Sequence, residues 1–169
     1  MDLEFDDLLA PVTNIREHDI LASWRWLVGP DAQPLLLTVL GDLFVEQPTG
    51  EVSFLDTYEG SLKRVSDSRD EWKRLLQDPG NLHRWFAPDL VAALHARGLR
   101  PTEGQSYSPI HPPVLGGTMD AGNFECVPWH VHFIPMGQLH EQVKDLPPGT
   151  PIAGVDIEWD RPKPWWKFW

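Results

Sequence analysis

The segment "GQLHEQVKDLPPGT" gathers a histidine, acids and a lysine that could act as an acid, a base or a metal ligand. A zinc-protease helix needs two histidines four residues apart around a glutamate, because that spacing puts both imidazoles on one face. Lys144 occupies the place of the second histidine. Three apolar residues instead follow the i, i+4, i+7 spacing of an amphipathic helix, Leu139, Val143 and Leu146. The pattern predicts a packing helix that the prolines end, with His140 directed away from its apolar face.

Other short motifs are equally weak as signs of catalysis. His130 and His132 in "WHVHF" would share one face of a strand, but no third ligand follows at a recognisable spacing. "LGGT" lacks the lysine of a phosphate loop, and no serine or cysteine sits in a nucleophile motif. The sequence therefore predicts no enzyme, no cofactor, and neither catalytic nor metal-binding residues. The alternative is an enzyme that uses His111, His130, His132 or His140 in a cleft.

Charge is distributed unevenly along the 169 residues, which carry a net charge of −11. Residues 1–60 hold 12 acids against 2 bases, whereas the remainder holds 13 acids against 12 bases. An acidic field repels nucleic acid and accelerates encounters with basic proteins. The charge therefore disfavours direct binding of nucleic acid. It is compatible both with a basic protein partner and with an acidic surface that only keeps the fold soluble.

Compartment is indicated by what the chain lacks. The start, "MDLEFDDLLA", is acidic where a signal peptide would be basic, and no apolar run is long enough to span a membrane. The single Cys126 can form no internal disulfide. These features favour a cytoplasmic protein that does not bind membranes.

The spacing of apolar residues along the chain predicts the positions of the helices and strands. The first 30 residues have helical spacing, and Leu35 to Val65 reads as an antiparallel meander with "PTG" and "EG" turns. Ser68 and Glu71 form a capping box before a helix that we expect to end at Pro79-Gly80, followed by a short turn. "APDLVAALHARG" predicts a further helix. A long loop over residues 100–122 and an extended segment from Phe124 to Ile134 follow.

The predicted fold is α+β, with an antiparallel sheet built from the meander and the Phe124 to Ile134 strand, and helices packed against it. We expect a helical segment over 1–33, an α+β domain over 34–153 and a Trp-rich tail over 154–169. The tail, "DRPKPWWKFW", is expected to dock on the core, because an exposed patch this apolar would invite aggregation.

Four segments in this order and spacing resemble a known bacterial family: "GDLFVEQPTGEVSFLDTYEGSLKRVSDS", "WFAPDLVAALHARGLRPTEGQSYS", "PPVLGGTMDAGNFE" and "GQLHEQVKDLPPGT". Together they are similar to the C-terminal domain of type VI secretion DNase-immunity proteins, over about Gly41 to Ile152. Ser106 stands where that family is expected to have a cysteine. The resemblance implies a binding protein without catalytic residues.

The resemblance and the charge point to one function by separate routes. The resemblance implies an immunity protein that binds a secreted toxin, a type VI DNase, and occludes its basic groove. Acids and two tryptophans near the N-terminus are the expected contacts, although core tryptophans and a solvated acidic face remain open as alternatives: Asp2, Glu4, Asp6, Asp7, Glu17, Asp19, Trp24 and Trp26. The rival function is a regulatory or scaffold module without a toxin partner.

Overall fold

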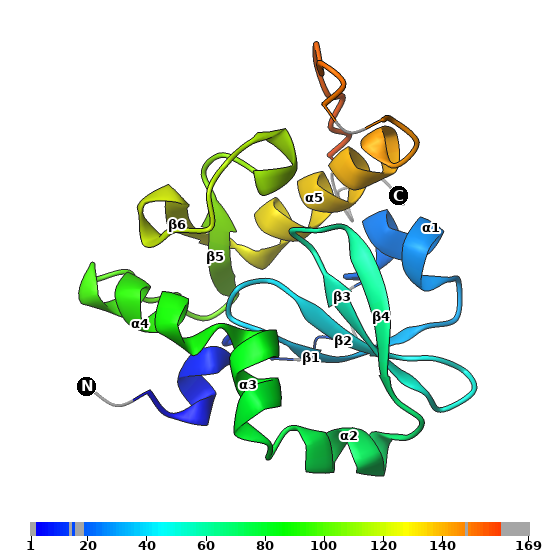
Figure 1. Cartoon of the computed structure of the whole chain (residues 1–169), viewed down its shortest axis with the longest axis vertical. Coiled ribbons are helices and arrows are strands. Elements are labelled where there is room, and N and C mark those ends of the chain that lie inside the picture. The colour runs from blue at the N-terminus through cyan, green and yellow to red at the C-terminus, as the bar shows by residue number, and fades with distance from the viewer. Residues whose placement is uncertain (1–2, 14, 16–18, 148, 160–169) are drawn as a thin grey trace, which may run out of the picture.

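A four-stranded antiparallel meander forms the centre of the protein, as the computed structural model shows (Figure 1). The structure describes residues 3–13, 15, 19–147 and 149–159. The strands run in sequence order, β1 (Gln33–Leu37), β2 (Leu43–Glu46), β3 (Val52–Asp56) and β4 (Ser61–Ser66). The meander predicted from the β-branched and aromatic texture is confirmed.

Both faces of this sheet are covered, so its central strands are apolar on both sides. Phe44 and Phe54 belong to a core cluster with Trp72, Trp85 and Phe86, beneath the helices that follow the sheet. Neighbouring residues on β2 and β3, Leu43, Val45 and Leu55, point to the opposite face of the sheet. There they pack in a second cluster with Trp24, Phe133 and Met136, which come from other parts of the chain. Strand alternation thus divides the core into two layers.

Three helices follow the meander, α2 (Arg69–Leu75), α3 (Pro79–Phe86) and α4 (Pro88–Ala96). The predicted cap is present, since the Ser68 hydroxyl accepts from the Glu71 amide at 3.2 Å. Pro79 begins a helix instead of merely ending one, because Asp78 caps it by accepting from the Asn81 amide at 2.9 Å. The expected short turn through Leu82, Trp85 and Phe86 is therefore α3.

The last third of the chain differs from the prediction. Strand β6 (Phe124–Pro128) ends at Pro128 and pairs with β5 (Gln105–Pro109), which lies inside the expected loop, and not with the meander. From Trp129 the chain is helical, α5 (Trp129–Val143). The apolar residues Phe133 and Met136 were the signal for it, because they continue the helical spacing to Leu139 and His140. The fold class, α+β, is confirmed, and the second sheet is the correction.

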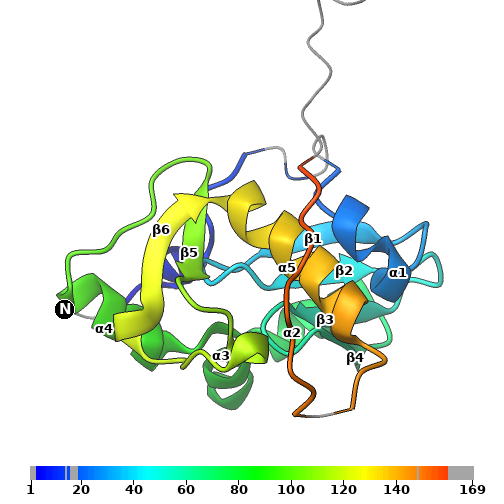
Figure 2. The same ribbon diagram turned by 90° about the horizontal axis from the view of Figure 1, so that it is seen from above.

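Short helical turns flank the N-terminal half: η1 (Phe5–Leu8), η2 (Ala22–Trp24) and α1 (Arg25–Val28). Two more, η3 (Pro113–Leu115) and η4 (Ala121–Asn123), lie between β5 and β6. Helix α5 lies against η2 and the second sheet, and the described end of the chain runs along α5 (Figure 2). Two glutamines of α5 bind that end through its backbone: Gln138 donates to the Glu158 carbonyl at 2.6 Å, and Gln142 to the Asp156 carbonyl at 2.8 Å. Residues 160–169 of the predicted docking tail lie outside the described residues. Within the described part of the chain, no helix has the length and apolarity to cross a bilayer.

Candidate functional site

The predicted acidic contacts near the N-terminus are carried by η1. Phe5 packs edge-on against Phe86 at 5.5 Å between ring centroids, and Leu8 is buried, so these two residues anchor the turn. Glu4 and Asp6 are left exposed, and Asp7 is half-buried. The Asp7 carboxylate accepts from the Glu4 amide at 2.9 Å, which satisfies the start of the turn. η1 therefore presents three carboxylates next to one another on the surface.

The remaining predicted contacts are placed differently. Asp19 is exposed and pairs with Arg25 at 3.3 Å, whereas Asp2 and Glu17 lie outside the described residues. Trp24 is 0% exposed and donates its indole N–H to the Phe133 carbonyl at 3.0 Å. Trp24 is thus a core residue, with no surface to offer a partner.

Trp26 lies between core and surface. Its ring stacks on Trp24 with centroids 6.1 Å apart, and its indole N–H donates to the Ser23 carbonyl at 3.1 Å. The Lys144 ammonium lies 5.1 Å from its ring centroid. Trp26 is half-buried, so part of its ring remains available for contact.

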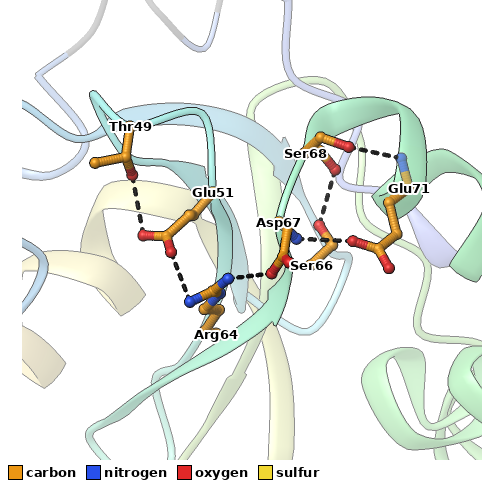
Figure 3. Close-up of polar contacts among 7 residues, drawn as sticks. All are labelled: Thr49, Glu51, Arg64, Ser66, Asp67, Ser68 and Glu71. Atoms are coloured by element: carbon orange, nitrogen blue, oxygen red, sulfur yellow. Dashed lines mark hydrogen bonds and ion pairs between the residues drawn. The ribbon is translucent and has the colours of Figure 1, made fainter.

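Three other acids of the first 60 residues, Glu46, Glu51 and Glu59, form ion pairs with bases from later in the chain. Figure 3 shows Arg64 between Glu51, at 2.6 Å, and Asp67. Lys63 pairs with Glu59 at 3.2 Å, and Arg69 pairs with Glu46. Among the described residues, Glu4, Asp6 and Asp7 have no such ion pair. The exposed acids of residues 1–60 that the described structure leaves without an ion pair are thus fewer than the sequence count indicates, and two of them, Glu4 and Asp6, lie together at η1.

His132 lies at the centre of a buried polar chain that joins α5 to the sheet. The Thr57 hydroxyl donates to the Asp42 carboxylate at 3.0 Å, so it accepts from His132 Nε2 at 2.9 Å. His132 Nδ1 then accepts from the Ser108 hydroxyl at 3.1 Å. This chain of donors and acceptors requires a neutral imidazole. Burial lowers the pKa of His132 to about 3 and raises that of Asp42 well above its usual value.

His140 is also buried, which corrects the prediction that it faces away from the apolar side of its helix. Its Nε2 donates to the Thr57 carbonyl at 3.0 Å, and its ring lies 5.8 Å from that of Trp24. Gly60 lies directly beneath the ring, where a Cβ atom would come within 2.3 Å of His140 Nδ1. The two buried histidines of α5 therefore fix the helix to Thr57, His132 through the hydroxyl and His140 through the carbonyl.

The other two histidines considered as catalytic candidates are exposed. His130 lies on α5, and His111 lies in the loop after β5. No group of three or more His, Cys, Asp or Glu side chains within the described ranges is arranged to hold a metal ion. The histidines that sequence reasoning kept open for chemistry serve the packing of α5 where they are buried.

A groove of about 490 Å³ lies between β3 and β4 on one side and α2 and α3 on the other. Its charged residues have both signs, and burial raises the pKa of Asp56, one of them. The described residues that line it include no Ser, Thr, Cys or His: Phe54, Asp56, Glu59, Lys63, Arg64, Val65, Leu75, Asn81, Arg84 and Trp85. The described lining of the groove therefore offers carboxylate, amine and guanidinium groups but no hydroxyl, thiol or imidazole side chain.

Ser106 is fully buried on β5, and its hydroxyl has no hydrogen-bond partner among the described residues. A buried polar group without a partner costs about 1–3 kcal/mol. A thiol is a weaker donor and behaves as a small apolar side chain. The cysteine expected at this position from the family resemblance would therefore fit as a packing residue.

Acidification should destabilise the protein through His132. A neutral histidine with a folded pKa of about 3 gains a proton near pH 6.5 only in the unfolded state, so its stabilising contribution is present above that pH and is lost as pH falls. The raised pKa of Asp42 makes its contribution to stability change with pH in the opposite direction. That contribution is present in both the wild type and a His132→Gln variant, so it cancels when the two proteins are compared. We expect the stability difference between the two proteins to shrink by about 2 kcal/mol from pH 7 to pH 5 in urea unfolding. A difference independent of pH would contradict a buried neutral imidazole.

The fold is an α+β scaffold in which two histidines of α5 are buried in packing, and among the described residues the carboxylates of Glu4, Asp6 and Asp7 form no ion pair. Residues 66–140 match the family described as T6SS immunity protein Tdi1, C-terminal. The resemblance seen in the sequence is thus confirmed for this part of the chain, which spans α2 to α5.

Two further comparisons add little. No curated protein matches the chain. The crystal structure of Atu4351 from Agrobacterium tumefaciens aligns with a TM-score of 0.47 and 15% sequence identity, over 69% of this chain and 62% of that chain. The chain thus spans less than two thirds of that protein's length.

Sequence reasoning missed two exposed apolar side chains in the long loop, Ile110 and Met119, which are 62% and 44% exposed. The sequence predicted a long loop here, either a functional surface or a tightly folded packing segment, but apolar residue type predicts burial more often than exposure. Only the folded loop reveals that both side chains point outward.

Proposed function

We propose that this protein is an immunity protein, which binds a secreted type VI toxin and blocks its activity. The match of residues 66–140 to the immunity family carries this proposal. The finer proposal is that the toxin is a DNase and that the bound immunity protein covers the basic groove through which the DNase would hold DNA.

Electrostatics supports the finer proposal. A nuclease must present positive charge to phosphates, and a net charge of −11 attracts such a surface at long range. The unpaired carboxylates of η1, Glu4, Asp6 and Asp7, can take the place of phosphates against lysine and arginine side chains. Acids already paired within the protein, such as Glu46 and Glu51, are less available for this role.

The buried histidines support a binding role over catalysis. A general base has to reach its substrate and needs a pKa near the working pH. His132 is 1% exposed, and burial holds its pKa near 3. Its hydrogen bonds instead connect α5 to Thr57, the residue that follows β3.

Binding to the product of the adjacent gene, measured by calorimetry at 50 mM and 300 mM salt, tests the proposal. A triple variant, Glu4→Lys, Asp6→Lys and Asp7→Lys, should bind at least about tenfold more weakly at low salt, because charges at an interface act most strongly there. The matched control, Asp31→Lys, Asp70→Lys and Asp145→Lys, changes the net charge equally at three other exposed acids and should bind more tightly than the first variant.

Three outcomes separate the parts of the proposal. Absence of wild-type binding at micromolar concentration in low salt would overturn the immunity function. Binding that inhibits a toxin without nuclease activity would retain the immunity function and reject the DNase. Equal weakening in both triple variants would show that net charge acts, with no specific role for η1.

A further inference from the structure

Residues 110–123 form a closed loop between β5 and β6 that is held by one side chain, Asn123. The Asn123 amide nitrogen donates to two carbonyls, those of His111 and Thr118, both at 2.8 Å. Its amide oxygen accepts from the His111 N–H at 2.9 Å, and its carbonyl accepts from the Ile110 N–H at 2.7 Å. One residue thus fixes both arms of the loop to each other.

Local bonds stiffen the loop further. Gly117 lies against the opposite arm, where a Cβ atom would come within 1.8 Å of the His111 carbonyl oxygen. The Asp120 carboxylate accepts from the Thr118 hydroxyl and, at 2.8 Å, from the Gly122 amide. His111 Nε2 donates to the Leu115 carbonyl at 2.9 Å. A surface fixed in advance loses little conformational entropy when it binds.

The stiff loop displays the two apolar side chains noted above. Ile110 and Met119 each adjoin a residue whose carbonyl bonds to the same Asn123 nitrogen, so their backbones lie close together although nine positions separate them. Single exposed apolar residues are ordinary, but a pair fixed on a preorganised backbone has the character of an interface core.

The charge around this pair is suited to a basic partner. Residues 101–143 contain four acids and neither lysine nor arginine: Glu103, Asp120, Glu125 and Glu141. Hydrogen bonds from Thr118 and Gly122 lower the pKa of Asp120, and Arg97 contributes from outside this stretch. Helix α4 packs against both η4, at the end of the loop, and η1, and lies between them (Figure 1). The acids of η1 therefore flank the same helix as the loop.

We propose that loop 110–123 is a docking surface for the cognate toxin, with Ile110 and Met119 buried against it and the surrounding acids facing its basic residues. This proposal rests on the proposed function and adds its contact surface. An exposed apolar pair beside the Asp120 carboxylate matches the usual anatomy of a protein interface, an apolar centre next to polar residues.

Single substitutions test the loop without disturbing the core, because both side chains are exposed. Ile110→Lys and Met119→Lys should each weaken binding of the adjacent-gene toxin by about tenfold or more, as truncation of an interface centre does. Leu146→Lys is the matched control, since Leu146 is 44% exposed, like Met119, and lies beyond α5. It should change the affinity by less than about threefold. Thermal unfolding confirms that each variant is folded.

Ile110→Glu separates apolar contact from charge. If Ile110 becomes buried against the toxin in the complex, the glutamate variant should also bind more weakly. If the surface acts through charge alone, the added carboxylate should tighten binding to a basic toxin. Tighter binding by Ile110→Glu, or unchanged binding by both lysine variants, would overturn the proposal.

Toxin binding and the oligomeric state of the wild type distinguish a failure of the loop proposal from a failure of the proposed function. If the wild type does not bind the toxin, the proposed function fails before the loop is tested. If light scattering shows that the protein alone is a dimer and that Ile110→Lys makes it a monomer, the loop contacts a second copy of the chain, which would also overturn the proposal.

Discussion

Replacing Trp24 by alanine is expected to lower the free energy of unfolding by about 3–5 kcal/mol, the cost of removing a large aromatic side chain from a packed core. Trp24 is 0% exposed, and its ring lies 6.0 Å from that of Phe133 and 5.8 Å from that of His140. The substitution also removes the indole donor to the Phe133 carbonyl. Guanidinium unfolding followed by circular dichroism measures the change.

Trp26→Ala is the control for this substitution. Trp26 stacks on Trp24 but is only half-buried, so its removal should cost clearly less stability. A Trp24→Ala protein of unchanged stability that no longer bound the toxin would contradict a core role and return Trp24 to the interface.

Gly41→Ala is expected to cost at least about 3 kcal/mol, from two separate causes. Gly41 has a φ of +92°, which a residue with a Cβ adopts only with strain. The added Cβ would also lie 2.4 Å from His132 Cδ2, in a ring that hydrogen bonds hold on both sides. The ring cannot withdraw without breaking the buried chain to Asp42.

Gly50→Ala isolates the first cause. Gly50 has a φ of +88° but no atom within 4 Å of the added Cβ, so its loss should be about 1–2 kcal/mol. Chemical unfolding of both variants gives the difference that belongs to the His132 contact. Equal losses would show that the ring moves aside at little cost.

Local patterns explain which elements the sequence predicts well. The meander, the Ser68 cap of α2 and helix α4 each depend on residues within a few positions of one another. The strand predicted to Ile134 failed because "WHVHF" alternates over five residues, while its helical spacing becomes clear only with Met136, Leu139 and His140. A short apolar window fits either period.

Charge is the clearest case of a linear property that folding changes. Residues 1–60 contain 12 acids in the sequence, but Arg64, Lys63 and Arg69 come from later segments to neutralise Glu51, Glu59 and Glu46. Asp42 is withdrawn from the surface altogether. Among the described residues, the exposed carboxylates of η1 and of Asp31 are acids of this segment that form no ion pair.

By itself the sequence determined the antiparallel meander, the α+β class, the acidic net charge and the resemblance to an immunity family, because periodicity, composition and motif order are properties of the linear chain. Only the tertiary structure decided that Trp24, His132 and His140 are buried. Their partners, Phe133 and Thr57, are 75 to 109 positions away, and no local pattern specifies such a pairing. Folding likewise decided the hydrogen bonds by which the Asn123 side chain closes loop 110–123 and leaves Ile110 and Met119 exposed. The residue types of this loop alone predict neither its shape nor its exposed face.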